Sequence, residues 1–466
     1  MDCTASRSHL LTRPRLIWIS RLVIIASVAC IGLFAIWQFQ VPEKLQLHAL
    51  WTTQPLKSDS TRPFNSSLYL NGAPTSISRE NLRPEMKYIT SWGSGGWTND
   101  VISMINLLYL ALITERIPII PVFLPGHQLL NSYGYAGENP LVFSDVFDLA
   151  YLRDAMKIPI LEWHQVKGQD DFSQKESIGC WSVWPVIQKQ DPAPRKSFIP
   201  WFLKLDVSYT KAPDWIKLKP GNENDRVSTF WALAALAFPA TRQASLVPPW
   251  PSKKNVTLPP DQHLLCFDCL YYLSVRESDE LELDYSPAWR FVGQHMRWTP
   301  YIERMATKYL RKAFKIAEHD EIPPFIAVHV RHNDFIDWCD EGFKSPDDCF
   351  APLSTIQKRV KQVQDELLTA KGIDTMHVVV TSDEKNNTWW EGIRELGWVR
   401  LDHEETKERY GFWHPILIDA VVQSMGAGFV GTARSTVSIL ASRRVETWRN
   451  GPTRMVRWGR PGADDD

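Results

Sequence analysis

The stretch Phe325–Asp334, FIAVHVRHND, decides the fold of the second half of the chain. Its apolar run predicts a buried strand, and the end of that strand carries His329, Arg331 and Asp334. A buried parallel strand that brings charged residues to its carboxyl end is how open α/β sheets build ligand sites. Because Arg331 offers a planar fork of donors that fits a phosphate, the stretch predicts an anion site at a strand end.

Helices and strands alternate around this stretch. Helical spacing of apolar residues predicts helices and short apolar runs predict strands, in this order: helix 299–319, strand 325–330, helix 354–370, strand 377–381, helix 389–396, strand 398–401, helix 415–425, strand 428–430 and a last helix from Ser435. Such alternation is typical of a parallel sheet with helices on both faces.

The first half of the chain predicts a second lobe, and 466 residues are too many for one ordinary domain. A strand at 87–92, a glycine-rich turn at 93–100, a helix at 101–114 and a strand at 117–123 form a strand–loop–helix–strand unit. The segment 142–152, a Trp- and Pro-rich region at 180–215, an alanine-rich helix near 229–238 and a Pro-rich loop at 248–260 follow, with boundaries that the pattern leaves open.

The composition excludes some classes of function. Lys and Arg number 52 against 53 Asp and Glu, so the chain lacks the basic excess of a bulk nucleic-acid binder. The hydrophobic content of 44% suffices for sizeable cores. Tryptophan faces stack on sugars, but we expect most of the 21 tryptophans to pack in cores and between lobes.

The segment Leu22–Phe39 is uncharged and about as long as a membrane-spanning helix must be. Four arginines precede it and no comparable cluster follows: Arg7, Arg13, Arg15 and Arg21. This bias predicts a signal anchor with the body outside the cytosol. A cleaved signal peptide is the alternative, disfavoured by the length of the run and the lack of a small-x-small cleavage site. We expect a cytosolic tail (1–21), a span (22–39), a stem (40–85), two lobes (86–290 and 291–455) and a tail (456–466).

Cysteines and glycosylation signals agree with a lumenal body. Cys339 and Cys349 lie ten residues apart in a polar loop and are predicted to form a disulfide. Cys266 and Cys269 are open to a bridge with each other or with Cys180, or to half of a zinc site that has no second half in the sequence. Three triplets are N-glycosylation acceptors if the body is translocated: Asn65, Asn255 and Asn386.

The first candidate site is His329-Val-Arg331-His-Asn-Asp334. Side chains alternate along a strand, so His329 and Arg331 share one face and are expected to emerge at the same crevice. Arg331 would neutralise a diphosphate, and Asp334 would orient the arginine or bind a hydroxyl. A surface ion pair at a strand end is the alternative.

The second candidate is Gly431-Thr-Ala-Arg-Ser435-Thr436-Val-Ser438, where a strand stops at a glycine and a helix starts with hydroxyl residues. Free N–H groups and the helix dipole favour an anion at such a start. Ser435 as a plain N-cap is the alternative, compatible with phosphate binding. No lysine follows the glycine, so the motif is not a P-loop.

Two weaker motifs complete the set. In the glycine-rich turn, Gly95 and Gly96 would let the backbone approach a ligand and Asn99 would reach it; the alternative is a tight turn with Asn99 as helix cap. Thr98 stands where a dinucleotide fingerprint has its third glycine, so NAD binding is not indicated. Asp383, after the strand at 377–381, would accept from a base or ribose, or lie in a plain helix-entry turn. No Asp-x-Asp follows an apolar strand, so a metal-dependent sugar-nucleotide site is not indicated, and no GxSxG elbow suggests a hydrolase.

Taken in order, the motifs WGSGGWTND, HVRHNDF, VVVTSDE and FVGTARSTVSILASRR resemble the GDP-fucose protein O-fucosyltransferase superfamily over residues 87–450. The Trp-Cys after HVRHNDFID, with its downstream cysteine, resembles fungal members. The resemblance implies an α/β fold of two Rossmann-like lobes (GT-B-like). It also implies metal-independent, inverting transfer of fucose, with no cofactor and with GDP-fucose as donor substrate. The C-terminal lobe would hold the GDP-sugar and the N-terminal lobe the acceptor.

Residue by residue, Arg331 matches the arginine that pairs with the β-phosphate, with His329 and Asp334 as donor-side neighbours. Asp383 matches a residue near the guanine or ribose. The remaining matches are the phosphate-binding hydroxyls of Ser435 and Thr436, next to Gly431, and the asparagine that faces the reacting sugar, Asn99.

This chain departs from the family pattern at two places. It has Ser94-Gly95-Gly96 where some members carry a glutamate as base, and His332-Asn333 where Arg-Gly is common. The identity of the general base therefore stays open, with Asp100 and Asp334 as candidates. The identity of the acceptor stays open as well. We expect a single-pass type II Golgi or ER membrane enzyme that transfers fucose to a protein or glycan hydroxyl. The alternatives are a catalytically silent, membrane-tethered glycan- or protein-binding member of the same fold, and a transferase that uses another nucleotide sugar.

Overall fold

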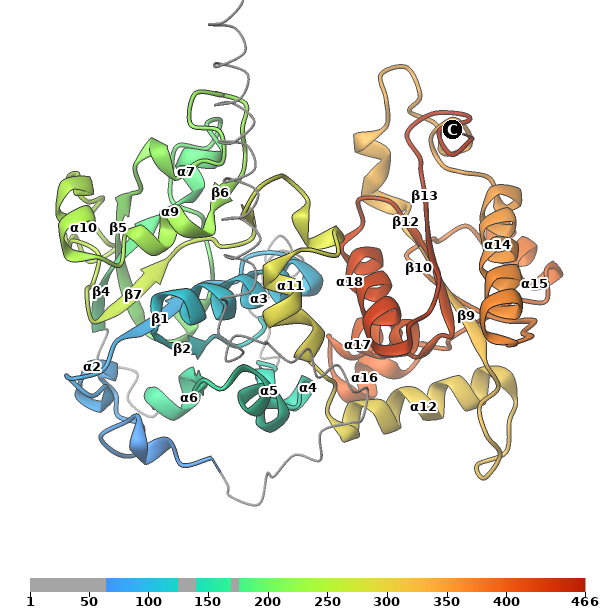
Figure 1. Ribbon diagram of the computed structural model, residues 1–466, viewed down its shortest axis with the longest axis horizontal. Coiled ribbons are helices and arrows are strands. Elements are labelled where there is room, and N and C mark those ends of the chain that lie inside the picture. The colour runs from blue at the N-terminus through green and yellow to red at the C-terminus, as the bar shows by residue number, and fades with distance from the viewer. Residues whose placement is uncertain (1–63, 125–139, 169–175, 466) are drawn as a thin grey trace, which may run out of the picture. The chain divides into compact units, whose positions relative to one another are not determined.

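The computed structural model describes residues 64–124, 140–168 and 176–465 (Figure 1). In these ranges the strands form one large parallel sheet in each half of the chain and a small sheet of two short strands, β6 (Ser228–Thr229) and β8 (Leu273–Ser274). The predicted span Leu22–Phe39 and the first part of the predicted stem lie outside the described residues.

The sheet of the first half has six strands in the order β3-β2-β1-β7-β4-β5. They are β1 (Tyr88–Ser91), β2 (Ile117–Ile120), β3 (Leu161–Glu162), β4 (Glu176–Ser182), β5 (Leu205–Lys211) and β7 (Leu264–Phe267). β1 pairs in parallel with β2 and with β7, so the predicted strand–loop–helix–strand unit is present. Strands β3, β4, β5 and β7 were not predicted. The end of β4 and all of β5 lie in the Trp- and Pro-rich region, where Ser, Thr and Gly interrupt the apolar residues.

Helix α3 (Trp97–Thr114) fills the core of this half and begins four residues earlier than predicted. Its N-cap is Gly96, which leaves Asn99 inside the first turn rather than at the cap. In the described residues, α3 is the one helix long and apolar enough to cross a membrane, but most of it is buried in the protein, as in a core helix.

The other helices of this half are short: α2 (Ser78–Asn81), α4 (Phe143–Val146), α5 (Leu149–Met156), α6 (Trp163–Val166), α7 (Trp184–Ile187), α8 (Ile199–Phe202), α9 (Phe230–Ala235), α10 (Pro239–Ser245), α11 (Pro287–Phe291) and the 3₁₀ turn η4 (Glu280–Glu282).

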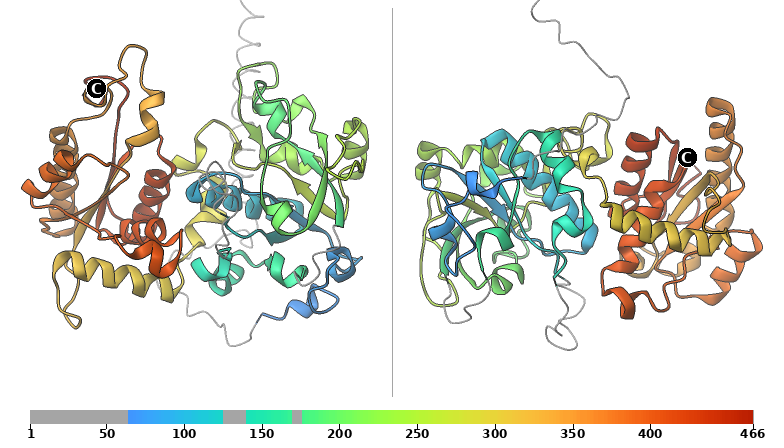
Figure 2. Two further views of the ribbon diagram at one scale, coloured as in Figure 1. Left: turned by 180° about the vertical axis from the view of Figure 1, so that it is seen from behind. Right: turned by 90° about the horizontal axis from the view of Figure 1, so that it is seen from below.

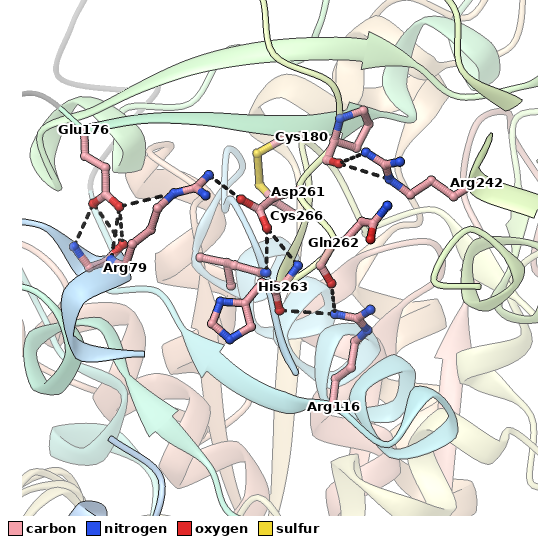
Figure 3. Close-up of polar contacts among 12 residues, drawn as sticks. Arg79, Arg116, Glu176, Cys180, Arg242, Asp261, Gln262, His263 and Cys266 are labelled. Carbon is pink, nitrogen blue, oxygen red and sulfur yellow. Dashed lines mark hydrogen bonds and ion pairs between the residues drawn. A yellow bond between two sulfur atoms is a disulfide. The ribbon is translucent and has the colours of Figure 1, made fainter. Parts of the chain in front are cut away.

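A polar network holds the segment that leads into β7 (Figure 3). Arg79 forms an ion pair with Asp261, whose other oxygen accepts the N–H groups of His263 and Leu264 at 2.8 and 3.0 Å. Arg116 donates to the carbonyls of Gln262 and His263 at 3.1 and 3.3 Å. These contacts lie at the amino end of β7 and so fix the sheet from the side opposite to its carboxyl ends.

A disulfide joins Cys180 on β4 to Cys266 on β7, so of the pairings that the sequence left open this one is formed. Cys269 stays free and buried. The bridge closes a loop of 86 residues, which restrains the unfolded chain more than a short loop does.

The sheet of the second half has five parallel strands in the order β11-β10-β9-β12-β13. They are β9 (Phe325–Val330), β10 (His377–Ser382), β11 (Val399–Arg400), β12 (Gly428–Thr432) and β13 (Thr453–Val456). The first four lie where the sequence predicts strands; β13 was not predicted. In the register, Gly431 and Thr381 lie on either side of His329.

Helices cover both faces of this sheet. They are α12 (Pro300–Phe314), α13 (Pro346–Cys349), α14 (Leu353–Lys371), α15 (Asn387–Glu395), α16 (Thr406–Tyr410), α17 (His414–Met425), α18 (Thr436–Arg444) and the π-helical turn η7 (Val445–Arg449). Ile326 and Val328 of β9 pack in the cluster with α14 and α15, whereas Phe325 and Ala327 pack in the cluster with α12 and α17. This alternation explains why β9 reads as a continuous apolar run.

The chain after β13 packs on the second sheet instead of extending as the predicted tail. Asp464 is 5% exposed, pairs with Arg359 at 2.6 Å and accepts the N–H of Arg457 at 2.9 Å. Cys339 and Cys349 form the expected disulfide.

Side chains from both halves meet between the two sheets, where α3, α11 and α18 lie (Figures 1 and 2). One apolar cluster includes residues of α3, α12, α17 and α18. Trp289 of the first lobe donates to Thr447 of the second lobe at 3.0 Å. The bond from Trp298 to Ser424, at 2.9 Å, lies within the second lobe. Tryptophan thus contributes to the contact between the lobes, as its frequency in the sequence predicts.

Candidate active site

Arg331 lies just beyond the end of β9, between two carboxylates. Its Nη1 lies 2.9 Å from Asp383 Oδ2 and its Nη2 lies 2.6 Å from Asp334 Oδ1. Asp383 follows the adjoining strand β10 and its side chain is 20% exposed, whereas that of Asp334 is 58% exposed. Asp383 therefore fixes the guanidinium from the protein side, and Asp334 holds the more exposed side.

His332 links the same two strand ends. Its backbone N–H donates to Asp383 Oδ1 at 2.9 Å, and its ring Nδ1 lies 2.5 Å from Glu384 Oε2. The ring stacks on Phe350 with centroids 4.3 Å apart. The residue that departs from the family pattern thus supports the loop that carries Asp383.

Thr432, at the end of β12, ties Arg331 to the start of α18. Its hydroxyl accepts the N–H of Arg331 at 2.9 Å and donates to the carbonyl of His329 at 3.2 Å. Its carbonyl accepts the N–H of Ser435 at 3.2 Å. Arg331 and Ser435, 104 positions apart in the printed sequence, are therefore both bound to one residue. The sequence predicts that the two residues bind one anion, and in the structure both of them contact Thr432.

His329 does not emerge at the crevice, contrary to expectation. It is 7% exposed, and its Nδ1 lies 2.8 Å from the hydroxyl of Ser438, which also accepts the N–H of Thr432 at 2.9 Å. Burial, and then the positive charges of Arg331 and His332, lower the pKa of His329 to about 3. The imidazole is thus neutral and braces the loop between β12 and α18.

Helix α18 begins at Thr436 after the N-cap residue Ser435. The Ser435 hydroxyl makes no capping hydrogen bond, and the residue is 3% exposed, so the alternative of a plain side-chain cap is not realised. A helix start leaves N–H groups free and carries positive dipole charge, which suits a phosphate. Gly431 is required here, because a Cβ would lie 2.7 Å from the Cβ of Ser438.

Hydroxyl groups from the first lobe reach the same helix start. Thr436 Oγ1 donates to Asn99 Oδ1 at 2.9 Å, and Thr98 Oγ1 lies 2.7 Å from Thr436 Oγ1. Since the Thr436 hydroxyl has one proton and gives it to Asn99, Thr98 is the donor of the second bond. Asn99 thus contacts the start of α18 through Thr436, and its role towards the reacting sugar stays a prediction.

The glycine-rich turn is folded around its own side chains. The N–H groups of Ser94 and Gly95 both donate to Asp100 Oδ1 at 2.9 Å. A Cβ at Gly93 would lie 2.7 Å from the Asp100 carboxylate, and one at Gly95 would lie 2.7 Å from Asn99. The N–H of Gly95 is therefore already bonded within the turn, and the close approach of a ligand to this glycine stays a prediction. A Cβ at Gly96 would meet nothing within 4 Å, which leaves that backbone open to a ligand.

Asp100 is buried at 3% exposure behind this turn. Burial raises the pKa of its carboxyl to about 7, against the lowering effect of the two N–H donors and of Arg195. Arg195 in turn donates to the hydroxyl of Ser94 at 3.0 Å. Asp100 shapes the turn from within and is poorly placed to meet an acceptor as base.

Two cavities adjoin the ends of β9 and β10. One of about 20 Å³, lined by Arg331, His332, Phe350 and Trp458, is barely large enough for a water molecule. The other, of about 510 Å³, lies at the carboxyl ends of β10 and β11 and is lined by Glu384, His403 and Asp419 among others. Asp419 Oδ1 lies 2.8 Å from His403 Nε2. Only the second cavity has room for a nucleobase.

Three residues of this site escaped the sequence analysis: Thr432, Ser438 and Asp419. The first two stand inside a motif that was recognised, but their contacts depend on the pairing of β9 with β12. Asp419 had a signal, since it is the one acidic residue in the apolar helix α17. Among the described residues no cluster of three or more His, Cys, Asp or Glu side chains has the arrangement of a metal site.

The arrangement, a cationic strand end beside a helix start at the carboxyl edge of a parallel sheet, is suited to holding an anionic ligand. The family model for GDP-fucose protein O-fucosyltransferase matches residues 88–447, and the chain belongs to this family. It is accordingly a glycosyltransferase of the fucosyltransferase type.

No curated protein matches the chain. A solved structure of POFUT1 in complex with GDP-fucose is 14% identical, with a TM-score of 0.48 over 81% of this chain and 98% of that one. The fucosyltransferase NodZ from Bradyrhizobium is also 14% identical, with a TM-score of 0.37 over 77% of this chain and 93% of that one.

The raised pKa of Asp100 predicts a pH-dependent stability. Its value of about 7 in the folded protein lies above the ordinary 3.8, so folding favours the protonated form. The contribution is fully present below pH 3.8 and is lost as the pH rises towards 7. Asp100→Asn keeps the acceptor oxygen and removes the charge. Free energies of unfolding are measured by urea titration. As the pH increases from 5 to 8, we expect the value for this variant to rise relative to that for the wild type. The control variant Asp320→Asn should show no such trend, and parallel pH curves for Asp100→Asn and wild type would contradict the assignment.

Proposed function

We propose that this protein transfers fucose from GDP-fucose to a hydroxyl of a protein or glycan acceptor, in a single inverting displacement that needs no metal ion. One observation carries the proposal: Arg331 and the start of α18 are bound to the same residue, Thr432, at the carboxyl edge of the second sheet. A guanidinium and a helix start at one edge form a site for two phosphate groups.

The contacts of Arg331 suggest how a diphosphate enters. Asp383 holds Nη1 and would stay, because it also accepts the N–H of His332. Asp334 is the more exposed partner, and a phosphate oxygen would replace it on Nη2. The arginine then stabilises the charge that develops on the leaving GDP, which is an electrostatic role in catalysis. The hydroxyls of Ser435 and Thr436 and the N–H groups of the α18 start would take the remaining phosphate oxygens.

The cavity of about 510 Å³ is the natural place for the guanine ring of GDP. Asp419 lines it with a carboxylate of which Oδ1 contacts His403. A carboxylate accepts both N1–H and the exocyclic amino group of guanine, whereas uracil offers one N–H between two carbonyl oxygens that a carboxylate repels. This chemistry favours GDP over UDP.

The proposal extends to the membrane-anchored, lumenal placement expected from Leu22–Phe39. Two observations support it: the disulfides Cys180–Cys266 and Cys339–Cys349, which persist in oxidising compartments, and the exposure of all three glycosylation acceptors.

Arg331→Ala should lower transfer from GDP-fucose by about 10²–10³-fold, because the variant lacks the cation at the leaving group. The measurement is turnover with purified protein, and the thermal midpoint should stay near that of the wild type. Arg304→Ala, which changes an exposed arginine on α12, is the matched control and should be fully active. Near wild-type turnover in Arg331→Ala would defeat the donor-site assignment.

Calorimetry with nucleotides tests the proposed guanine cavity. It also tests the alternative that the protein is a catalytically silent member of the fold. The wild type should bind GDP more tightly than UDP or CDP, and Asp419→Asn should bind GDP about 10–100-fold more weakly through the loss of a charged acceptor. Asp365→Asn on α14, outside the cavity, should bind as the wild type does. A protein that binds no GDP would be the silent member, and equal affinity for GDP and UDP would point to another nucleotide sugar.

The lumenal placement predicts that protein made in eukaryotic cells carries N-glycans at Asn65, Asn255 and Asn386. Treatment with an N-glycosidase should lower its mass, and the triple Asn→Gln variant should not respond. A wild-type protein of unchanged mass, with its body digestible by protease in intact microsomes, would place the body in the cytosol.

A further inference from the structure

A third cavity, of about 130 Å³, lies on the other side of the α18 start from the cavity proposed for the guanine ring. Thr436 and Ile439 of α18 line it from the second lobe. Its walls from the first lobe come from α3, α9, the segment around β8 and η4, and include Asn106, Phe230, Tyr271, Tyr272, Asp279 and Glu282. None of these first-lobe residues has a role in the donor site described above.

The order of the strands gives the direction in which a bound donor would run. The cavity proposed for the guanine ring lies at β10 and β11, Arg331 follows β9, and α18 follows β12. A GDP-fucose molecule with its guanine ring at β10–β11 and its phosphates between Arg331 and α18 therefore directs its fucose past Thr436. The cavity of 130 Å³ begins at that residue, so it lies where the acceptor must meet the sugar.

The walls of this cavity are aromatic and acidic. Tyr271 and Tyr272 meet edge to face with ring centroids 4.6 Å apart, and Phe230 adds a third ring. Asn106 on α3 donates to the carbonyls of Leu270 and Tyr271 at 2.8 and 3.2 Å, which fixes the tyrosine segment on the core helix. Ring faces that stack on the C–H side of a sugar, beside carboxylates that accept from its hydroxyls, form a surface suited to a carbohydrate.

Two glutamates of η4 have different surroundings. Glu280 is 3% exposed and accepts the N–H groups of Val275 and Arg276 at 2.7 and 3.2 Å, so it holds the turn. Glu282 lines the cavity, and in the described part of the chain its carboxylate has no hydrogen bond and no ion pair. Burial, and then the nearby charge of Asp279, raise the pKa of Glu282. Its side chain is exposed on the cavity wall, and a carboxylate with free oxygens in such a place suits a general base.

We propose that this cavity binds a sugar unit of the acceptor, and that Glu282 is the general base of the transfer. The inference rests on the proposed function and supplies the base that the glycine-rich turn lacks. The acceptor O–H proton passes to the Glu282 carboxylate as the acceptor oxygen bonds to the anomeric carbon of the fucose. The bond from that carbon to the β-phosphate oxygen breaks, and its electron pair leaves with GDP, beside Arg331.

The base assignment is tested with Glu282→Gln, which keeps the size of the side chain and removes its basicity. Transfer should fall by about 10²–10⁴-fold while calorimetry shows unchanged GDP affinity. In the wild type, turnover should fall at low pH as Glu282 is protonated, and the residual rate of the variant should lack this acid limb. Glu277→Gln, which changes an exposed glutamate that does not line the cavity, is the matched control and should behave as the wild type.

Retained turnover in Glu282→Gln would overturn the base assignment, and so would a loss of GDP binding, because the residue would then serve the donor. If the wild type itself binds no GDP, it is the donor proposal that fails, so the two failures are distinguishable.

The sugar assignment is tested by saturation-transfer NMR with the protein, GDP and methyl glycosides of glucose, galactose, mannose and N-acetylglucosamine. At least one glycoside should receive saturation from the wild type, and Tyr272→Ala should abolish this signal without changing the GDP affinity. Glu277→Gln should keep it. No signal from any glycoside, or an equal signal from Tyr272→Ala, would overturn the assignment and leave a peptide hydroxyl as the acceptor.

Discussion

The contact on which the active site depends is the ion pair between Arg331 and Asp383, made at the ends of two neighbouring parallel strands. A guanidinium needs fixed acceptors to keep one orientation, and Asp383 is fixed in turn by the N–H of His332. Because β9 and β10 are buried and in register, the two residues of the pair start from fixed strand ends. The rest of the site is arranged around this charge.

Thr432 and Thr436 extend that arrangement to the first lobe. Thr432 binds the N–H of Arg331, and Thr436 accepts from Thr98 and donates to Asn99. Hydroxyl groups suit this role because each donates and accepts at once, so they join backbone and side-chain groups without burying a charge. The two lobes thus share the start of α18, which joins the proposed donor and acceptor sites.

Two buried titratable groups support this framework. His329 lies under the loop that joins β12 to α18, and its lowered pKa keeps the ring uncharged beside Arg331. Asp100 lies under the glycine-rich turn, and its raised pKa reflects the same cost of burying a charge. Both residues come from motifs that looked catalytic in the sequence, and both shape loops. The group with free oxygens in the acceptor cavity, Glu282, stands in no such motif.

The sequence by itself determined the second lobe almost completely: the apolar runs of β9, β10 and β12 and the amphipathic spacing of α12 are local signals that need no partner. It also predicted the type of chemistry, because an arginine at a strand end and hydroxyls at a helix start are groups suited to binding an anion. The strands β4, β5 and β13 were beyond its reach, since they are recognisable only through their neighbours in the sheet. Only the tertiary structure decided that the Gly95 N–H is bonded within its own turn, that Asp419 lines a cavity and that Glu282 lines the same cavity as Thr436. These facts depend on residues distant in sequence meeting in space, and a local pattern carries no record of its distant partners.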